Sequence, residues 1–348
     1  MTLTEQIAWD DTILPFQLDR SGIRGRVVRL SRALDQMLLH HHYPGPVNRL
    51  VAETALLTAL VGHAIKLRWK LSIQIRGDGP VKLIASDYFA PAEAGEPARI
   101  RACADYDAEA LAALGESEDP YRLVGKGLFA ILIDQGAGNL PYQGVTPISG
   151  NSLSECAATY FAQSEQLPTR FRLAVSCTAE GDTTRWRAGG VMLQKLPEGE
   201  TRHEGGTGAD GLVHPDGILA GEEAEDWHRA NILLDTVEEA ELLGPEVSPI
   251  SLLVRLFHEE EPRVFDPQPV TFGCTCSQDK VREVLSRHDR AELEEMAASG
   301  GGEITADCRF CGRRYRFRPE NITAADEAPS PAPPSPGETG RDGAGEEG

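Results

Sequence analysis

Two pairs of cysteines near the C-terminal end constrain this chain more than any other feature of its sequence. They are Cys274 and Cys276, and then Cys308 and Cys311. Four thiolates form a complete ligand set for tetrahedral Zn²⁺, and Cys-x-x-Cys is a common half of a structural zinc site. The first pair is closer than in a usual zinc ribbon, and such neighbouring thiols can also close a small, strained disulfide. The pattern therefore predicts a zinc site that is either a static clamp or one that oxidation can dismantle.

The overall charge and the cysteine count restrict the partners and the compartment. The formal net charge is −20, so phosphate backbones repel the chain and nucleic acid is not expected as its main partner. Seven cysteines, four of them in metal spacing, suit a reducing compartment better than a disulfide framework. The other three, Cys103, Cys156 and Cys177, have no metal spacing and are expected to be core residues. Residues 1–11 contain no basic segment followed by an apolar run, and no apolar stretch reaches membrane-spanning length. We therefore expect a cytoplasmic protein with no membrane partner.

Hydrophobic periodicity predicts an α+β fold for the N-terminal part. Apolar residues recur at helical spacing from Pro46 to Trp69, which indicates a long buried helix. Alternating residues predict strands joined by short turns, and short turns imply an antiparallel sheet. These strands are expected near residues 25–30, 71–75, 81–85, 100–104, 127–133, 142–148, 171–177 and 186–193. We expect residues 1–196 to form this antiparallel sheet with its packed helices.

The remainder of the chain divides by composition into three further segments. Residues 197–264 are predicted to be a flexible, helical linker region, with helices at 222–243 and 248–258 that must pack against the N-terminal sheet. Residues 265–322 are predicted to form a small C-terminal zinc-binding domain, with helices near 278–288 and 290–298 and a strand near 313–318. Residues 323–348 are acidic and rich in Pro and Gly, which predicts a disordered tail.

Two other functions compete for the cysteine pairs. A thiol–disulfide oxidoreductase would use Cys308 and Cys311 at the start of a helix, whereas Gly312 and a strand-like run follow them here. A static zinc-ribbon module could bind RNA or a protein partner through the arginines that surround the second pair. No nucleophile elbow, phosphate-binding loop or metalloprotease motif occurs, so we do not expect an enzyme.

Several motifs together resemble the heat-shock protein 33 family, the redox-regulated holdase chaperones of bacteria. The resemblance covers about residues 15–322. The motifs are Gly273-Cys-Thr-Cys276, Cys308-Arg-Phe-Cys311, Ser164-Glu-Gln-Leu-Pro-Thr169, His258-Glu-Glu, Asp266-Pro-Gln, Tyr142-Gln-Gly-Val145 and Gly77-Asp-Gly-Pro80. The Gly-rich residues near 205–211 and the acidic tail depart from the family pattern.

The resemblance implies a switch in which residues 1–196 are the chaperone core and residues 265–322 are the redox-switch domain. In the reduced, inactive state, Cys274, Cys276, Cys308 and Cys311 would hold one Zn²⁺. Oxidative stress would pair Cys274 with Cys276 and Cys308 with Cys311, release the zinc and unfold the linker. The chain would then bind unfolded client proteins without ATP, typically as a homodimer.

Overall fold

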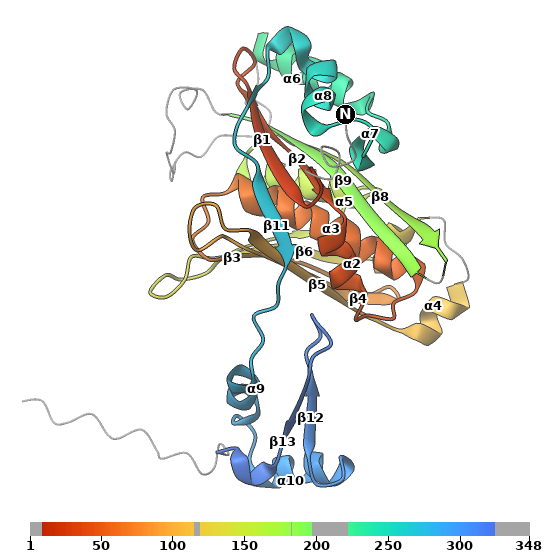
Figure 1. Cartoon of the computed structure of the whole chain (residues 1–348), viewed down its shortest axis with the longest axis vertical. Coiled ribbons are helices and arrows are strands. Elements are labelled where there is room, and N and C mark those ends of the chain that lie inside the picture. The colour runs from red at the N-terminus through yellow and green to blue at the C-terminus, as the bar shows by residue number, and fades with distance from the viewer. Residues whose placement is uncertain (1–8, 115–118, 182, 197–221, 324–348) are drawn as a thin grey trace, which may run out of the picture. The chain divides into compact units, whose positions relative to one another are not determined.

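The computed structural model describes residues 9–114, 119–181, 183–196 and 222–323 (Figure 1). The chain forms two compact units. The first unit contains the residues up to Cys274 together with residues 309–312, and the second contains Thr275–Cys308 and the residues from Arg313 onward. Helices and a large sheet occur together, which confirms the α+β class. The predicted tail and the Gly-rich residues near 205–211 lie outside the described residues, and the four predicted domain ranges stay predictions.

A large sheet organises the first unit, in the order β7-β6-β3-β4-β5-β11-β1-β2-β9-β8, with β10 also paired to β1. Neighbouring strands are antiparallel, as predicted, except that β11 runs parallel to β5. The strands are β1 (Thr12–Leu18), β2 (Ile23–Leu30), β3 (Lys70–Gly77), β4 (Val81–Phe89), β5 (Ala98–Tyr106), β6 (Gly127–Asp134), β7 (Tyr142–Pro147), β8 (Thr169–Glu180), β9 (Thr183–Lys195), β10 (Arg263–Val264) and β11 (Gln268–Phe272).

The main core lies between the two halves of this sheet, around the long helix α3 (Gly45–Ala64). Thr54 and Thr58 are buried on this helix, and each hydroxyl donates a 2.7 Å hydrogen bond to the carbonyl oxygen four residues earlier. The other helices of this part are α2 (Arg32–Leu38), α4 (Ala108–Leu114) and α5 (Leu153–Tyr160), with short turns η1 (Pro120–Val124) and η2 (Phe161–Glu165). Among the helices that the structure describes, none has the length and hydropathy needed to cross a membrane.

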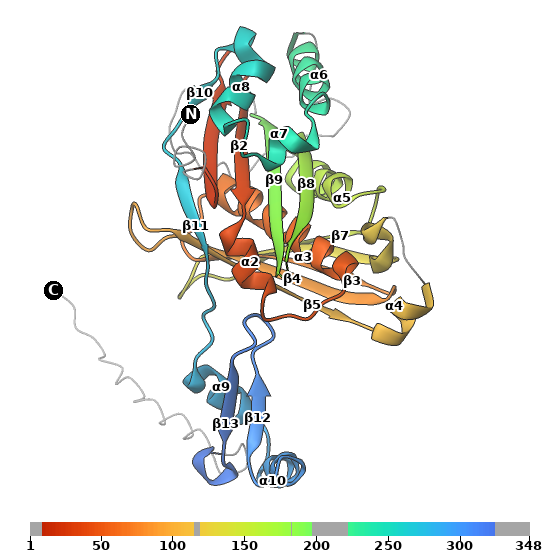
Figure 2. The same cartoon turned by 45° about the vertical axis from the view of Figure 1, so that its right-hand side comes forward.

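A second core lies on the opposite face of β1, β2, β8 and β9, under three helices (Figure 2). These helices are α6 (Glu222–Asp235), α7 (Glu239–Leu243) and α8 (Pro249–Phe257), followed by the turn η4 (His258–Glu260). Phe16 stacks on Phe257 with ring centroids 6.1 Å apart, and Leu234 and Leu253 are fully buried there. The prediction that the helices pack against the sheet is therefore confirmed.

The prediction of one continuous helix over residues 222–243 is wrong. Residues 236–238 interrupt it, and Glu238 begins α7 with its own capping box. The Glu238 side chain accepts from the backbone of Glu241, and the Glu241 side chain accepts from the Glu238 N–H across 3.2 Å. This reciprocal cap supplies acceptors to backbone N–H groups that a continuous helix would have bonded internally. The two glutamates therefore favour a second helix that begins after Glu238.

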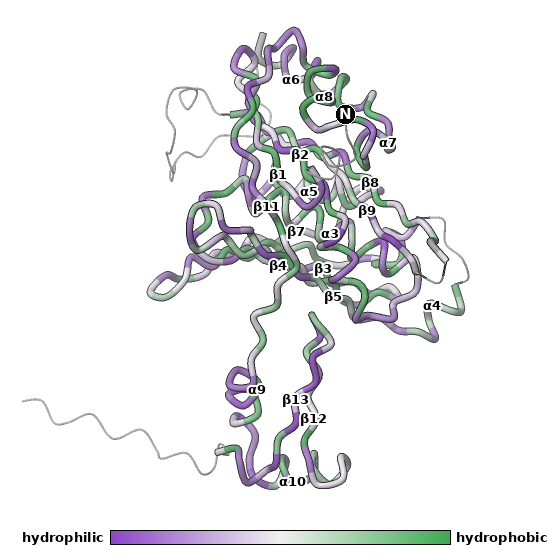
Figure 3. Tube along the Cα trace, viewed as in Figure 1, coloured by the Kyte–Doolittle hydropathy of each residue, from purple (hydrophilic) through white to green (hydrophobic). Residues whose placement is uncertain are grey.

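The second unit consists of α9 (Gln278–Leu285), α10 (Arg290–Ser299), the hairpin β12 (Ile304–Asp307) and β13 (Arg314–Phe317), and the turn η5 (Pro319–Asn321). Ser277 and Asp289 cap the two helices with their side chains. Figure 3 shows how hydrophilic α9 and β13 are. The buried apolar core is small and consists of Leu285, Leu293, Ala297, Ile304, Phe317 and Ile322. A core of this size rarely stabilises a domain without a metal or another cross-link.

Candidate metal and redox site

The structure brings the four cysteines of the two sequence pairs together. Cys274 and Cys276 follow β11, and Cys308 and Cys311 lie in the turn that joins β12 to β13. Their four sulfur atoms all lie within 4.8 Å of one another, and all four residues are half-buried.

The donor set fits a metal ion that prefers sulfur ligands. In a tetrahedral site with metal–sulfur bonds of about 2.3 Å, the sulfurs lie roughly 3.8 Å apart. The observed spread of up to 4.8 Å therefore closes around an ion with small side-chain movements. The group contains four thiols and no carboxylate or imidazole, which is typical of a closed structural site for a soft or borderline ion.

The remaining cysteines lie elsewhere in the first unit. Cys103 and Cys156 are buried, as the sequence predicted for core residues. Cys177 was expected in the core as well, but it is exposed on β8. The alternation along β8 identifies a strand correctly, yet small residues such as Cys177 can occupy either face near the end of a long hairpin.

The β12–β13 hairpin positions the second pair. The backbone N–H of Cys308 donates to the carbonyl oxygen of Arg313 across 2.9 Å, which closes the turn. Gly312 has a φ of 65°, a left-handed conformation that glycine adopts without steric cost. The hydroxyl of Tyr315 donates to the sulfur of Cys276 at 3.1 Å. This hydrogen bond raises the pKa of Tyr315 and keeps the phenol protonated beside the sulfur.

Arg101 on β5 contacts the first pair from the large sheet. Its Nη1 donates to the sulfur of Cys274 at 3.4 Å, and its Nη2 lies 2.6 Å from a carboxylate oxygen of Asp87. Burial by itself lowers the pKa of Arg101, but the carboxylate of Asp87 and the sulfur of Cys274 outweigh burial and raise the pKa above its usual value. Arg101 therefore stays charged beside the thiol.

Sequence reasoning missed Arg101 and Tyr315 as neighbours of the cysteines. Arg101 alternates with Ile100 and Ala102, which identifies only a strand with one solvent-facing side. It is 173 residues from Cys274 in the chain, so no local spacing could connect them. Tyr315 alternates with Arg314 and Arg316, which indicates a strand but not the side chain that Tyr315 contacts.

The arginines around the second pair are partly neutralised by acidic partners. Arg309 pairs with Asp105 at 3.2 Å. Two more pairs lie within the second unit, Arg314 with Asp307 at 2.8 Å and Arg318 with Glu303 at 3.7 Å. These pairs agree with the even balance of acids and bases in this part of the sequence.

The fold and the cysteine cluster define an α+β protein with four cysteines close enough together to bind one metal ion. Residues 11–318 match the family described as Hsp33 protein. The 33 kDa chaperonin of Caulobacter vibrioides is 37% identical over 313 residues, which cover 89% of this chain and 95% of that protein. The 33 kDa chaperonin of Ectopseudomonas mendocina is 36% identical over 320 residues, covering 90% and 96%. The chain therefore belongs to the Hsp33 family.

The fold agrees with a solved structure of the same kind. The crystal structure of the 33 kDa chaperonin, a heat shock protein 33 homolog, from Thermotoga maritima superposes with a TM-score of 0.68. The sequence identity is 20%, and the match covers 89% of this chain and 96% of the other. At this identity, the likeness concerns the fold.

Proposed function

We propose that this protein is a redox-regulated, ATP-independent molecular chaperone of the cytoplasm that holds unfolding proteins under oxidative stress and is not an enzyme. One observation carries the proposal: the sulfur atoms of four cysteines all lie within 4.8 Å of one another in a chain of the Hsp33 family. The names of the relatives, 33 kDa chaperonin, support the chaperone class.

In the reduced state, Cys274, Cys276, Cys308 and Cys311 hold one Zn²⁺. When bound, the ion keeps the four sulfurs as thiolates and supplies folding free energy, on the order of 10 kcal/mol in small zinc domains. The four cysteines then cross-link the segment after β11 to the β12–β13 turn. The small core of the second unit needs such a cross-link to stay folded.

Oxidation removes the ligands in pairs. Cys274 joins Cys276, and Cys308 joins Cys311. In each pair the two thiolates give up two electrons as the S–S bond forms, and one molecule of hydrogen peroxide accepts these electrons with two protons from solvent and becomes two water molecules. The disulfides no longer hold the ion, so the second unit loses its cross-link and unfolds.

Release of α6, α7 and α8 from the sheet would then expose apolar residues for clients. The second core supplies this surface, with Phe16 and Leu193 from the sheet and Leu252 and Phe257 from α8. The net charge of −20 limits co-aggregation of the loaded chaperone. The active form is a homodimer.

The test follows zinc content, free thiols and aggregation of a chemically denatured client enzyme in the same samples. The samples are taken before and after peroxide at elevated temperature. We expect one zinc and four protected thiols in the reduced protein, with zinc loss and suppression of aggregation only after oxidation. Cys177→Ser is the matched control because Cys177 is an exposed thiol outside the cluster, and this variant should switch as the wild type does.

Two results would contradict the proposal. If zinc stays bound after peroxide, or if the client is protected equally in both states, the site is a static clamp. Salt-sensitive binding of RNA by the reduced protein would then favour the zinc-ribbon module. Dominant cross-linked pairs such as Cys276 with Cys308 would contradict the disulfide assignment.

A further inference from the structure

A row of polar side chains crosses three strands of the large sheet and ends at Arg101. Ser72, Asp87 and Arg101 lie opposite one another on β3, β4 and β5. The hydroxyl of Ser72 donates to one oxygen of Asp87, and the other oxygen accepts from Nε of Arg101 at 2.8 Å. The side chains of Asp87 and Arg101 are only 6% and 13% exposed. The guanidinium is therefore fixed in the plane of this fork by partners on two sides.

The fixed guanidinium of Arg101 contacts a cysteine of the first pair and an aromatic residue of the second pair's turn. Its Nη1 donates to the sulfur of Cys274, and its central carbon lies 3.9 Å from the centroid of the Phe310 ring. Phe310 is one of the two residues between Cys308 and Cys311. Arg101 thus contacts the sulfur of Cys274 directly. It reaches the second pair only through the ring of Phe310.

A second contact, from the segment between α2 and α3, holds the turn. His41 Nε2 lies 3.3 Å from the carbonyl oxygen of Phe310, and its ring stacks on Tyr43 with centroids 4.6 Å apart. The Tyr43 hydroxyl exchanges hydrogen bonds of 3.0 and 2.9 Å with the backbone of Ala104 on β5. Phe310 is therefore bound through its ring by Arg101 and through its backbone by His41, and both supports rest on β5.

We propose that Arg101 is a positioning residue that keeps the sulfur of Cys274 next to the turn that contains Phe310. Arg101 thereby sets the rate at which the site releases its metal. The inference rests on the proposed function, because it takes the cysteines as zinc ligands. Loss of a metal from four thiolates begins when one sulfur departs. A sulfur that stays tethered next to the other ligands rebinds quickly, because its effective concentration remains high. Without Arg101, Cys274 and the turn can separate after that first step.

The test measures zinc transfer from the full-length, reduced, zinc-loaded protein to an excess of a chromogenic chelator. The variants are Arg101→Gln, Arg101→Lys, Phe310→Leu and the double variant Arg101→Gln/Phe310→Leu. Hydrogen exchange of peptides that cover residues 309–312 gives a second measurement that does not depend on chaperone activity. Arg76→Gln is the control because it removes one exposed arginine of the same sheet at a site outside the row.

We expect each single variant to release zinc about tenfold faster than the wild type, the loss expected for a charge-assisted or cation–π contact. The double variant should be no faster than the faster single variant, because the two side chains act through one contact. Arg101→Lys can pair with Asp87 but lacks the planar fork, so it should preserve thermal stability and still release zinc quickly. A purely structural arginine would instead be rescued by lysine.

The inference would be overturned if the variants released zinc within about twofold of the wild-type rate, or if the effects of the two substitutions were additive in the double variant. Because Arg101→Gln leaves Asp87 without its cation, Arg101→Lys and Phe310→Leu carry the test if that variant fails to fold. A wild-type protein that holds no zinc in its four cysteines would overturn both proposals. A wild type that holds zinc and switches normally, with unchanged release from the Arg101 variants, would overturn this inference alone.

Discussion

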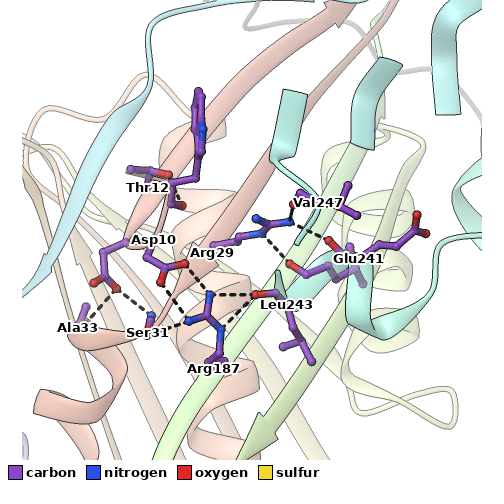
Figure 4. Close-up of polar contacts among 12 residues, drawn as sticks. Asp10, Thr12, Arg29, Ser31, Ala33, Arg187, Glu241, Leu243 and Val247 are labelled. Atoms are coloured by element: carbon purple, nitrogen blue, oxygen red, sulfur yellow. Dashed lines mark hydrogen bonds and ion pairs between the residues drawn. The ribbon is translucent and has the colours of Figure 1, made fainter. Parts of the chain in front are cut away.

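Arg29 on β2 donates from Nε to the carbonyl oxygen of Leu242, in the last turn of α7, across 2.9 Å (Figure 4). Its Nη2 donates to the carbonyl oxygens of Glu241 and Val247. The last carbonyls of a helix have no partner within it, and a cation there also complements the helix dipole. Burial lowers the pKa of Arg29 to about 10, so the guanidinium is still charged near neutral pH.

Arg187 on β9 makes a second contact of the same kind. Its Nη2 donates to the carbonyl oxygen of Leu243 at 3.1 Å and to a carboxylate oxygen of Asp10 at 2.6 Å. Two arginines of the sheet therefore bind the end of one short helix. This specific attachment holds α7, and with it the neighbouring α6 and α8, over the second core.

We predict that Arg29→Met loosens the attachment of α7. Methionine fills much of the volume but leaves the carbonyls of Glu241, Leu242 and Val247 without a donor, at about 1–3 kcal/mol for a buried unsatisfied group. Peptides that cover residues 236–257 should exchange amide hydrogens faster. Under the proposed function, the reduced, zinc-bound variant should also suppress client aggregation without oxidant.

Arg255→Met is the matched control for this substitution. Arg255 pairs with the carboxylate of Glu241 at 2.9 Å, but its side chain is 61% exposed. Such surface pairs contribute about 1 kcal/mol or less, so exchange should change little. Equal exchange in the two variants would show that the buried carbonyl contacts do not determine the attachment.

Gly189 on β9 provides an independent way to displace α7. A Cβ atom at this position would lie 2.2 Å from the carbonyl oxygen of Leu242, which is backbone and cannot rotate away. We predict that Gly189→Ala forces α7 off the sheet and costs roughly 1–3 kcal/mol, as overpacking does elsewhere. The free energy of unfolding and exchange over residues 239–243 would measure this.

Gly45→Ala serves as the comparison, since a Cβ there has no neighbour within 4 Å. This variant should be as stable as the wild type or slightly more stable, because alanine favours a helix over glycine. If Gly189→Ala were equally harmless, α7 would have to be free to shift without loss of its arginine contacts.

We predict that Cys311→Ser unfolds the second unit and leaves the first unit folded. The substitution removes one of four ligands, and the six buried residues of that unit cannot replace the metal. Amides of residues 278–307 should lose protection from hydrogen exchange, whereas those of α3 should keep theirs. Protected amides in the zinc-free variant would show that the small core is sufficient by itself.

The sequence predicted the helices and strands whose periodicity extends over several turns or alternations. α3 and the β3–β4 hairpin were found because each has a long apolar pattern. The strands β1, β10 and β11 were missed. β11 has five residues and includes Pro269, so its pairing depends on the edges that β1 and β5 offer rather than on its own pattern.

The cysteines of the candidate site could be predicted because metal ligands have characteristic local spacing. Their supporting side chains could not, because Arg101 reaches Cys274 only through the sheet pairing that places β5 next to β11. The same is true of Arg29 and α7, which are more than 200 residues apart in the chain. The sequence around a buried arginine on a strand does not indicate which distant carbonyl oxygens its guanidinium will bind.

Glu53 on α3 gives a prediction for the pH dependence of stability. Burial, opposed by Arg49, raises the pKa of Glu53 from its ordinary value of 4.5 to about 7. Between these values, the folded protein holds a proton that the unfolded chain has lost, so stability falls as the pH rises from 4.5 to 7 and is then constant. We predict that Glu53→Gln, which cannot ionise, removes this loss.

Relative to the wild type, Glu53→Gln should therefore gain about 2 kcal/mol in the free energy of unfolding between roughly pH 5 and pH 8. Denaturant titrations of both proteins at the two pH values measure the difference. The exposed Glu93→Gln variant controls for the loss of one negative charge from an acidic protein. A difference between Glu53→Gln and the wild type that is the same at both pH values would mean that Arg49 compensates the burial of this carboxylate fully.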